Sequence, residues 1–473
     1  MIGKIAFTGS RTATAPMTWG QRETWKDVAH FLPTVMPFFF IRRRVEVPEG
    51  LDLAAVLDTI GTLISRHETL RTRLIPSDAG LEQHIVRSGV LEAEIADAPT
   101  REECVAALDA HQHRQTSVAF AHESELSLRV IVASRAGEPA MVGLIFSHVT
   151  LDMQSATLCA KELTALLAAR AAGEPAPPAS PARQPVDQAL IEQSAEGTRR
   201  NEAALAHLRS VLETGAPSLF GEIVPTEGPR FRRGRLTSHT MPDQLRAVAV
   251  RTRSSPAAVL LAALTAMLYA TADADECLLS LIYGNRSEPE LRHAVGNVSQ
   301  EVVGRFTRQG TTFTDLLRRN TATALRAYRH GGYDPVAADA LIDEIERERG
   351  VRFNRLIRLN DMWSPTHATD RGGPRDLPAP EPAFDWLEGF DDDQVTLMVD
   401  VFGGPGVLHV VLLADMFQFP APEVEAFALG LDRLLAELAG REVALDEIAA
   451  VTGLAGGRRS TTARSAGRRS PAR

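Results

Sequence analysis

Aromatic residues make up only 5% of this 473-residue chain, and cysteine occurs three times. An odd, small number of cysteines without paired spacing argues against a disulfide framework and against a zinc site. Long apolar runs are also missing: the most apolar short stretch, 36–41, is far below the length that spans a membrane. With no signal peptide or anchor visible, we expect a cytoplasmic protein that has no membrane partner.

The charge balance excludes further classes of partner. The formal net charge is −9, although six arginines lie in the last sixteen residues; without those six positive charges the rest of the chain carries −15. So acidic a body repels nucleic acid and anionic membranes, and we expect neither as a partner. An acidic partner protein would be repelled as well, so docking with one would require a local basic patch.

Length and composition predict two lobes. The apolar fraction of 44% and the charged fraction of 23% are ordinary for a globular protein. Helical and strand patterns recur in both halves, so we expect a mixed α/β (α+β) fold. We predict an N-terminal lobe over 12–172, a proline-rich linker over 173–188, a C-terminal lobe over 189–450 and a disordered arginine-rich tail over 456–473.

Hydrophobic periodicity predicts the main elements. Apolar residues at helical spacing predict helices, and short β-rich runs bounded by turn residues predict strands. The predicted helices are 53–67, 153–170, 192–213, 256–269 and 422–439, and the predicted strands are 38–47, 70–75, 126–134 and 141–148, with a hairpin over 395–415.

One segment carries a candidate reaction centre. An apolar strand ends at His148, Asp152 follows four residues later, and a helix begins immediately after it. A histidine leaving a buried strand suits general base catalysis, because the imidazole pKa is normally about 6.5. Taken alone, the same spacing also fits a histidine and an aspartate that only shape a turn or a helix face.

Two other clusters suggest a metal only weakly. His111 and His113 lack an accompanying carboxylate or cysteine pattern, and a solvated helix face explains them. The run 391–393 of three aspartates is typical of a solvated loop. We therefore expect no metal.

Five motifs occur in the order of a known family. Ser147–Met153 resembles the pattern His-His-x-x-x-Asp-Gly, and Arg66–Thr72 matches Arg-His-Glu-x-Leu-Arg-Thr throughout. The other three are weaker: Pro16–Gln21 resembles Pro-Leu-Ser-x-x-Gln, the pair Gly284–Arg286 and Val295–Gln300 resembles the Gly-Arg and Gly-x-Phe-Val-Asn segments, and Tyr333–Pro335 is in the expected place. From about residue 12 to residue 440, the chain thus resembles the condensation domains of nonribosomal peptide synthetases, within the chloramphenicol-acetyltransferase-like superfamily.

The resemblance implies a fold and an activity. Family members have two chloramphenicol-acetyltransferase-like lobes in a V shape with a tunnel between them, and join a carrier-bound acyl thioester to an amine or hydroxyl acceptor. The second motif histidine, which carries the activity, matches His148. The motif aspartate, which is mainly structural, matches Asp152, and its arginine partner would be Arg286. Asn360 would lie near the tunnel floor.

The chain departs from the pattern at three positions. Ser147 stands where the family has its first histidine, and we expect it to support the site. Met153 replaces glycine and is expected to narrow the donor side of the tunnel, since glycine allows closer approach than any other residue. Ser299 lies in the segment where the family has its Asn-Thr pairing, and we expect it to contact substrate.

Three hypotheses about function follow. The first is a stand-alone condensation-type acyltransferase of antibiotic or other natural-product peptide biosynthesis. It would bind no cofactor, because the phosphopantetheine arm would arrive on a carrier protein supplied in trans. The second is a non-catalytic module that recruits a carrier protein or a partner enzyme. The third is a carrier-independent acyltransferase that uses a soluble thioester.

Overall fold

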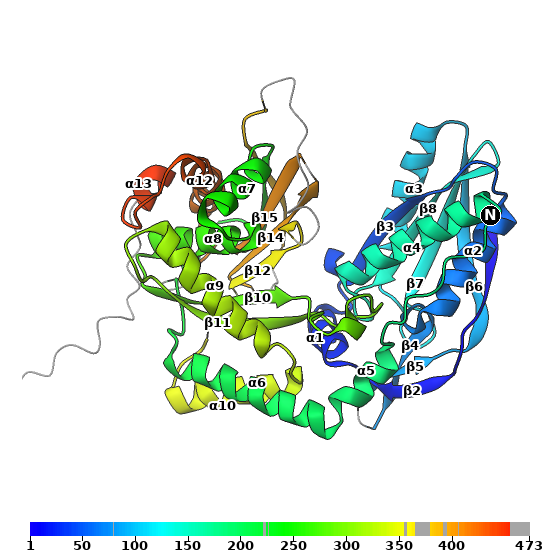
Figure 1. The fold of residues 1–473 in the computed structure, drawn as a ribbon, viewed down its shortest axis with the longest axis horizontal. Helices are drawn as coiled ribbons and strands as arrows, with labels where there is room; N and C mark the ends of the chain where they lie inside the picture. Colours follow the sequence, from blue (N-terminus) through cyan, green and yellow to red (C-terminus); the bar gives the residue numbers. More distant parts are fainter. Residues whose placement is uncertain are drawn as a thin grey trace, which may run out of the picture. The chain divides into compact units, whose positions relative to one another are not determined.

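The protein is described by a computed structural model, which covers residues 1–78, 80–220, 224–225, 227–353, 357–364, 379–390, 395–404 and 406–454. These residues form two compact units. The first comprises Met1–Glu202, Gly284–Gln300 and Gly332–Ala337, and the second comprises the described remainder. Each unit combines a β-sheet with packed helices (Figure 1), so the predicted mixed α/β class is confirmed.

The units divide at other places than the predicted lobes. The first unit continues through 173–188, where Arg183 pairs with Glu288 at 2.8 Å. Within α5 (Pro185–Glu192), Val186 and Ala189 are buried in a cluster with Ala15 and Ile85. The proline-rich segment therefore packs onto the first unit and is no boundary. The predicted tail, 456–473, and the aspartate run, 391–393, lie outside the described residues.

The first unit has two sheets among its described residues. The larger has the order β1-β6-β7-β8-β3, in which only β6 and β7 are parallel. The smaller has the order β2-β5-β4 and is antiparallel. Their bounds are β1 Ile2–Thr8, β2 Ala13–Pro16, β3 Phe40–Glu46, β4 Thr72–Ser77, β5 Gly80–Ile85, β6 Ser88–Ala98, β7 Leu128–Arg135 and β8 Glu138–Ser147.

Helices cover both faces of the larger sheet. On one face, α2 (Leu53–Arg66) and α4 (Met153–Ala171) share a buried cluster with the strands. On the other face, α3 (Arg101–Gln115) places Leu108 against β8 at Gly143, where a Cβ atom would lie 2.7 Å from the leucine Cδ1. A further helix, α1 (Trp19–Phe31), precedes β3.

The second unit contains a seven-stranded sheet among its described residues, ordered β11-β10-β12-β14-β15-β9-β13. Its core helix is α8 (Pro256–Ala272), which is buried along nearly its whole length. The strands are β9 Phe231–Ser238, β10 Glu276–Tyr283, β11 Gln300–Thr307, β12 Ile357–Asp361, β13 Ala383–Phe390, β14 Leu397–Gly404 and β15 Val407–Asp415. The other helices are α6 Ala195–Thr214, α7 Met241–Thr252, α9 Phe313–Arg329, α10 Pro335–Arg349, α12 Ala421–Gly440 and α13 Ile448–Thr452; the first residues of α6 and α10 are assigned to the first unit.

In the described parts of the chain, no single helix is both long and apolar enough to cross a bilayer; the bent pair α7 and α8 meets these criteria only when its two members are taken together.

The predicted elements are confirmed with small shifts at their ends. The predicted helix 53–67 is α2, 153–170 is α4, and 422–439 is α12. The predicted helix 192–213 is broken, because α5 ends at Glu192 and α6 begins at Ala195. The predicted hairpin 395–415 is the antiparallel pair β14 and β15, with Gly404 opposite Val407.

Gly61 allows α2 to approach β1 closely. A Cβ atom at position 61 would lie 2.2 Å from the carbonyl oxygen of Ala6 on β1, a distance that real Cβ atoms do not adopt. We therefore expect Gly61→Ala to lower the free energy of unfolding by about 1–3 kcal/mol, as overpacking of a core does, although alanine is the better helix former by about 1 kcal/mol. Urea denaturation measures this change.

The control substitution is Asp58→Ala, on the exposed side of the same helix. We expect it to change the free energy of unfolding by no more than about 0.5 kcal/mol. Equal stability of Gly61→Ala and the wild type would show that α2 and β1 can separate without cost.

Candidate active site

His148 lies at the junction of a strand, a turn and a helix. The strand β8 ends at Ser147, and the backbone N–H of His148 donates to Phe39 O at 2.9 Å. The turn closes with Asp152, whose Oδ1 accepts from Ser155 N at 2.8 Å and caps α4. An aspartate is among the best residues for this position, since its carboxylate pairs a backbone N–H that the helix leaves free.

The His148 ring has one engaged and one open nitrogen. Nδ1 lies 3.1 Å from the carbonyl oxygen of Leu151. Because a carbonyl oxygen only accepts, Nδ1 is the nitrogen that carries the hydrogen in the neutral ring, and Nε2 keeps its lone pair. Within the described residues Nε2 has no hydrogen-bond partner, and the side chain is half-buried. The ring is therefore set to accept a proton at Nε2.

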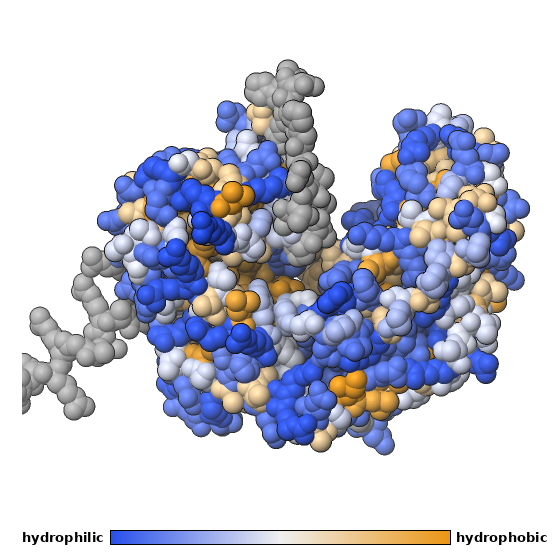
Figure 2. Space-filling model, viewed as in Figure 1, coloured by the Kyte–Doolittle hydropathy of each residue, from blue (hydrophilic) through white to orange (hydrophobic). Residues whose placement is uncertain are grey.

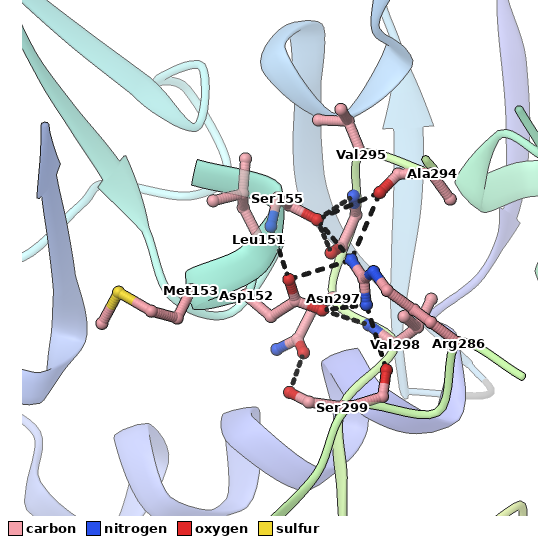
Figure 3. Close-up of polar contacts among 12 residues, drawn as sticks. Leu151, Asp152, Met153, Ser155, Arg286, Ala294, Val295, Asn297, Val298 and Ser299 are labelled. Atoms are coloured by element: carbon pink, nitrogen blue, oxygen red, sulfur yellow. Dashed lines mark hydrogen bonds and ion pairs between the residues drawn. The ribbon is translucent and has the colours of Figure 1, made fainter. Parts of the chain in front are cut away.

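Asp152 and Arg286 form a buried bidentate ion pair. Arg286 Nη1 lies 2.9 Å from Asp152 Oδ2, and Nη2 lies 3.0 Å from Oδ1. The two side chains are only 6% and 5% exposed. Oδ2 also accepts from the backbone N–H of Val298 at 3.2 Å. Figure 3 shows both carboxylate oxygens turned toward the guanidinium, so Asp152 holds the turn in place and has no oxygen left for a substrate.

Ser155 joins the helix to the segment that follows Arg286. Its Oγ accepts from Arg286 Nη2 at 2.7 Å and from Gly296 N at 3.0 Å, and lies 2.7 Å from Gly296 O (Figure 3). Asp152 N donates to the same carbonyl at 3.3 Å. The site is thus formed where the first turn of α4 packs against the segment 294–298.

Asn297 fixes the backbone of His148 directly. Its Nδ2 donates to the carbonyl oxygens of His148 at 2.9 Å and Val149 at 3.2 Å, and to Thr24 Oγ1 at 2.8 Å. Its Oδ1 accepts from Ser299 Oγ at 3.0 Å. The sequence pointed to the segment Val295–Gln300 but not to Asn297 within it. Asn297 bonds mainly to backbone carbonyl oxygens, and every residue type has these, so its partners form no recognisable sequence motif.

The Arg66–Thr72 motif supports the same segment. Thr69 Oγ1 donates to Val295 O at 2.8 Å. Glu162 on α4 lies 2.7 Å from Arg66 Nη1 and 2.6 Å from His67 Nε2. The motif therefore holds α4 and the segment 294–298 from the side of α2, which gives these residues a structural role.

The residues that we predicted to support the site or to bind substrate do not form one cluster. Ser147 is buried, and its Oγ has no hydrogen-bond partner within the described chain. Met153 is 37% exposed and points away from Arg286 (Figure 3). Ser299 is part of the site through its bond to Asn297. Asn360 belongs to the second unit, where it donates to Asp400 Oδ1 at 3.0 Å; burial raises the pKa of that aspartate.

Arg43 is a site neighbour that sequence reasoning did not single out. Its Nη2 lies 3.0 Å from Met153 O, 2.8 Å from Met153 Sδ and 3.0 Å from Thr157 Oγ1. Burial lowers the pKa of this arginine from its ordinary value. The guanidinium thus fixes the methionine that replaces the motif glycine, and only the structure reveals this pairing.

The helix α1 is anchored beside Asn297 at its N-terminus. Thr18 Oγ1 donates to Asn297 O at 3.1 Å, and a Cβ atom at Gly20 would lie 2.5 Å from that same oxygen. Glu192 Oε2 accepts from Trp19 N at 2.8 Å. Although Glu192 keeps some exposure to solvent, burial raises its pKa to about 7, while Gln188, Trp19 and Arg22 act in the opposite direction.

Among the acidic, histidine and cysteine side chains that the structure describes, no group of three or more could hold a metal ion.

The buried ion pair leads to a prediction about stability. Asp152→Ala leaves the Arg286 charge buried without its partner, so we expect the free energy of unfolding to fall by about 3–5 kcal/mol. Arg286→Met should cost a similar amount, and the double variant should cost less than the sum, because neither charge then remains. Urea denaturation of the four proteins measures the coupling.

The control for these substitutions of the buried ion pair is Arg101→Ala, which breaks the exposed 2.9 Å ion pair with Glu46. We expect it to cost less than about 1 kcal/mol, as for other surface pairs. Additive effects of Asp152→Ala and Arg286→Met would show that the two side chains do not stabilise each other.

Glu192 leads to a prediction about pH. Its pKa rises from an ordinary 4.5 to about 7 on folding, so the folded protein binds this proton more tightly than the unfolded chain does. The contribution of Glu192 to stability must then fall as pH rises from 4.5 to about 7 and stay constant above that range.

We therefore expect Glu192→Gln to gain stability over the wild type as pH rises through this range, because glutamine keeps an oxygen for Trp19 N without the buried charge. Thermal unfolding at a series of pH values measures the difference. Parallel pH curves for the two proteins would contradict the raised pKa.

The sequence and the fold both match known proteins. The family model described as "Condensation domain" matches residues 30–370. A linear gramicidin synthase of Brevibacillus parabrevis is 26% identical over 366 residues, which cover 74% of this chain and 4% of that protein. Phosphinothricin tripeptide synthetase PhsC of Streptomyces viridochromogenes is 26% identical over 358 residues, which cover 73% of this chain and 32% of that protein. The chain thus spans only a small part of the length of these curated relatives.

Two solved structures share the fold. The condensation domain that mediates chain release from the enacyloxin polyketide synthase has a TM-score of 0.68 at 18% identity, covering 99% of this chain and 85% of the other. A variant of the starter condensation domain of rhizomide synthetase RzmA, solved with C8-CoA, has a TM-score of 0.65 at 18% identity. The match covers 91% of this chain and 95% of the other. Since the family model spans well over half of the sequence, this chain belongs to the condensation domain family.

Proposed function

We propose that the chain is an acyltransferase that joins a carrier-bound acyl thioester to an amine, or in some cases a hydroxyl, with His148 as the catalytic base. Membership of the condensation domain family implies acyl transfer in natural-product biosynthesis. The observation that carries the proposal is the open Nε2 of His148, on a ring whose Nδ1 is held by Leu151 O.

The proposed reaction needs one proton acceptor. The amine nitrogen attacks the thioester carbonyl carbon, a C–N bond forms, and His148 Nε2 takes the proton that the nitrogen loses. The C–S bond then breaks, and the pantetheine sulfur leaves as a thiolate that receives the proton from His148. The proton is thus returned, and no metal or further reactant is needed.

The residues around His148 act as positioning residues in this proposal. Asn297 and Asp152 fix the two ends of the turn that carries the ring. Both oxygens of Asp152 are engaged by Arg286 and backbone N–H groups, which supports a structural role. The assignments of Met153, Ser299 and Asn360 to substrate binding stay predictions, as does the supply of the carrier on a separate polypeptide.

A soluble thioester is a second candidate donor. The specific observation in its favour is the similarity in fold to a starter condensation domain that was solved with C8-CoA. In that case the phosphopantetheine of coenzyme A would replace the arm of the carrier, and the chemistry at His148 would be unchanged.

Replacing His148 tests the proposal. We expect His148→Ala to lower the rate of amide formation by about 10²–10⁴-fold, the usual contribution of a positioned base. The assay follows amide formation from acyl thioesters of a peptidyl carrier domain, of N-acetylcysteamine and of coenzyme A, with a panel of amines. Unchanged thermal unfolding of the variant excludes a loss of folding as the cause.

The matched control is His113→Ala, which removes an exposed histidine from α3. Its rate should equal that of the wild type. If the wild type turns over none of these donors, or if His148→Ala is as fast as the wild type, the catalytic proposal is wrong and the non-catalytic recruiting module becomes the better description.

A further inference from the structure

The outer face of α9 is unusually basic for this protein. The helix contains four arginines and one acidic residue, Asp315, whose carboxylate is used to cap the N-terminus of the helix. Its buried face is apolar except for Asn320, and it packs into the core of the second unit. The opposite face, called here the α9 basic face, consists of Arg318, Arg319, Leu325, Arg326 and Arg329.

The helical spacing makes this face continuous. Arg318 and Leu325 are seven residues apart, and Leu325 and Arg329 are four apart, so the three lie in one row. Arg319 and Arg326 form the adjacent row. All four arginines are exposed, and Leu325 is 54% exposed at the centre. The surface over α9 in Figure 2 is accordingly mostly hydrophilic with a hydrophobic spot.

The charges on this face have no ion-pair partner inside the described protein. Arg318 and Arg329 form no hydrogen bond or ion pair there. The pKa of the Asp315 carboxyl is lowered mainly by its hydrogen bonds with Thr312 and Thr311, and the charge of Arg318 adds the smallest contribution. Arg319 donates to Gln309 Oε1 at 2.9 Å, and Arg326 donates to Thr323 Oγ1 at 3.3 Å, so both bind neutral groups. Elsewhere arginines are commonly paired, as Arg209 on α6 is with Glu344 on α10.

We infer that the α9 basic face is a docking surface for an acidic carrier protein, an inference that rests on the proposed function. The chain apart from its last sixteen residues is strongly acidic, so an acidic partner is repelled from most of the surface. A face of four arginines that have no ion-pair partner among the described residues, arranged around an exposed leucine, is complementary to an acidic helix that carries one apolar side chain. This face supplies the local basic patch that such docking requires.

Nucleic acid is the other class of ligand that a basic helix can bind. Affinity for a phosphate backbone requires positive charge extended over several phosphates. Here the charge is confined to about three turns of one helix on an acidic protein. A protein partner with a compact acidic surface fits these dimensions better.

Charge reversal on α9 tests the docking surface. The test protein carries Arg318→Glu together with Arg326→Glu, and the control carries Arg199→Glu with Arg347→Glu, two exposed arginines of α6 and α10 that are likewise free of ion pairs in the described chain. Affinity is measured by biolayer interferometry for a panel of acidic peptidyl carrier domains with octanoyl-phosphopantetheine attached, at low and at raised ionic strength. Amide formation from octanoyl N-acetylcysteamine is measured in parallel.

We expect the test protein to bind the carrier at least about tenfold more weakly than the wild type, with a smaller dependence on salt, and the control protein to bind within about twofold. Turnover of the N-acetylcysteamine thioester should be equal in all three proteins, because this donor needs no docking. Retained turnover and unchanged thermal unfolding also show that the charge reversals leave the fold intact.

Three results would overturn the inference: equal carrier affinity of the test protein and the wild type, no binding of any carrier by the wild type, or binding of a single-stranded RNA that is lost in the test protein and competes with the carrier. Failure of the proposed function is a different result. In that case the carrier binds through α9 but the wild type forms no amide from either donor, and the docking surface then belongs to a recruiting module.

Discussion

The buried ion pair between Asp152 and Arg286 is the constraint on which the arrangement of the site depends. Each charge is almost completely removed from water, so neither is tolerable without the other. Asp152 ends the turn that carries His148, and Arg286 begins the segment that contains Asn297. One pair of charges thus brings together two parts of the chain that are 134 residues apart in sequence.

Around this pair, nearly every contact to the His148 turn is made through main chain. Phe39 O, Gly296 O and Asn297 Nδ2 all bond to backbone groups of the turn, and Leu151 O holds the imidazole. Buried backbone groups must be paired, so this arrangement satisfies them while it fixes the ring. It also allows the side chains at positions 147 and 153 to differ from the family pattern, because the hydrogen bonds that fix the His148 turn involve mainly backbone groups.

The sequence was informative where chemistry and periodicity leave a pattern. The strand–turn–helix around His148 follows from residue types at fixed spacing, and the structure has it. The Asp152–Arg286 pairing was implied only by the family resemblance, and the structure has this ion pair too. Asn297, Ser155 and Arg43 were missed, because their partners are backbone atoms or side chains far away in the sequence, and such contacts leave no sequence period. The unit boundary was also misplaced: prolines at 173–188 indicated a linker, yet buried Val186 and Ala189 attach this segment to the first unit.

The return of residues Gly284–Gln300 to the first unit has a consequence for how the protein is made. A nascent chain that has emerged only as far as Glu202 lacks Arg286, so the Asp152 carboxylate has no counter-ion and the turn at His148 has no support from Asn297. Domains usually fold in the order of synthesis. Here the unit that is made first lacks Arg286 and Asn297 until about a hundred further residues have been synthesised, and it is complete only when Gly332–Ala337 has followed.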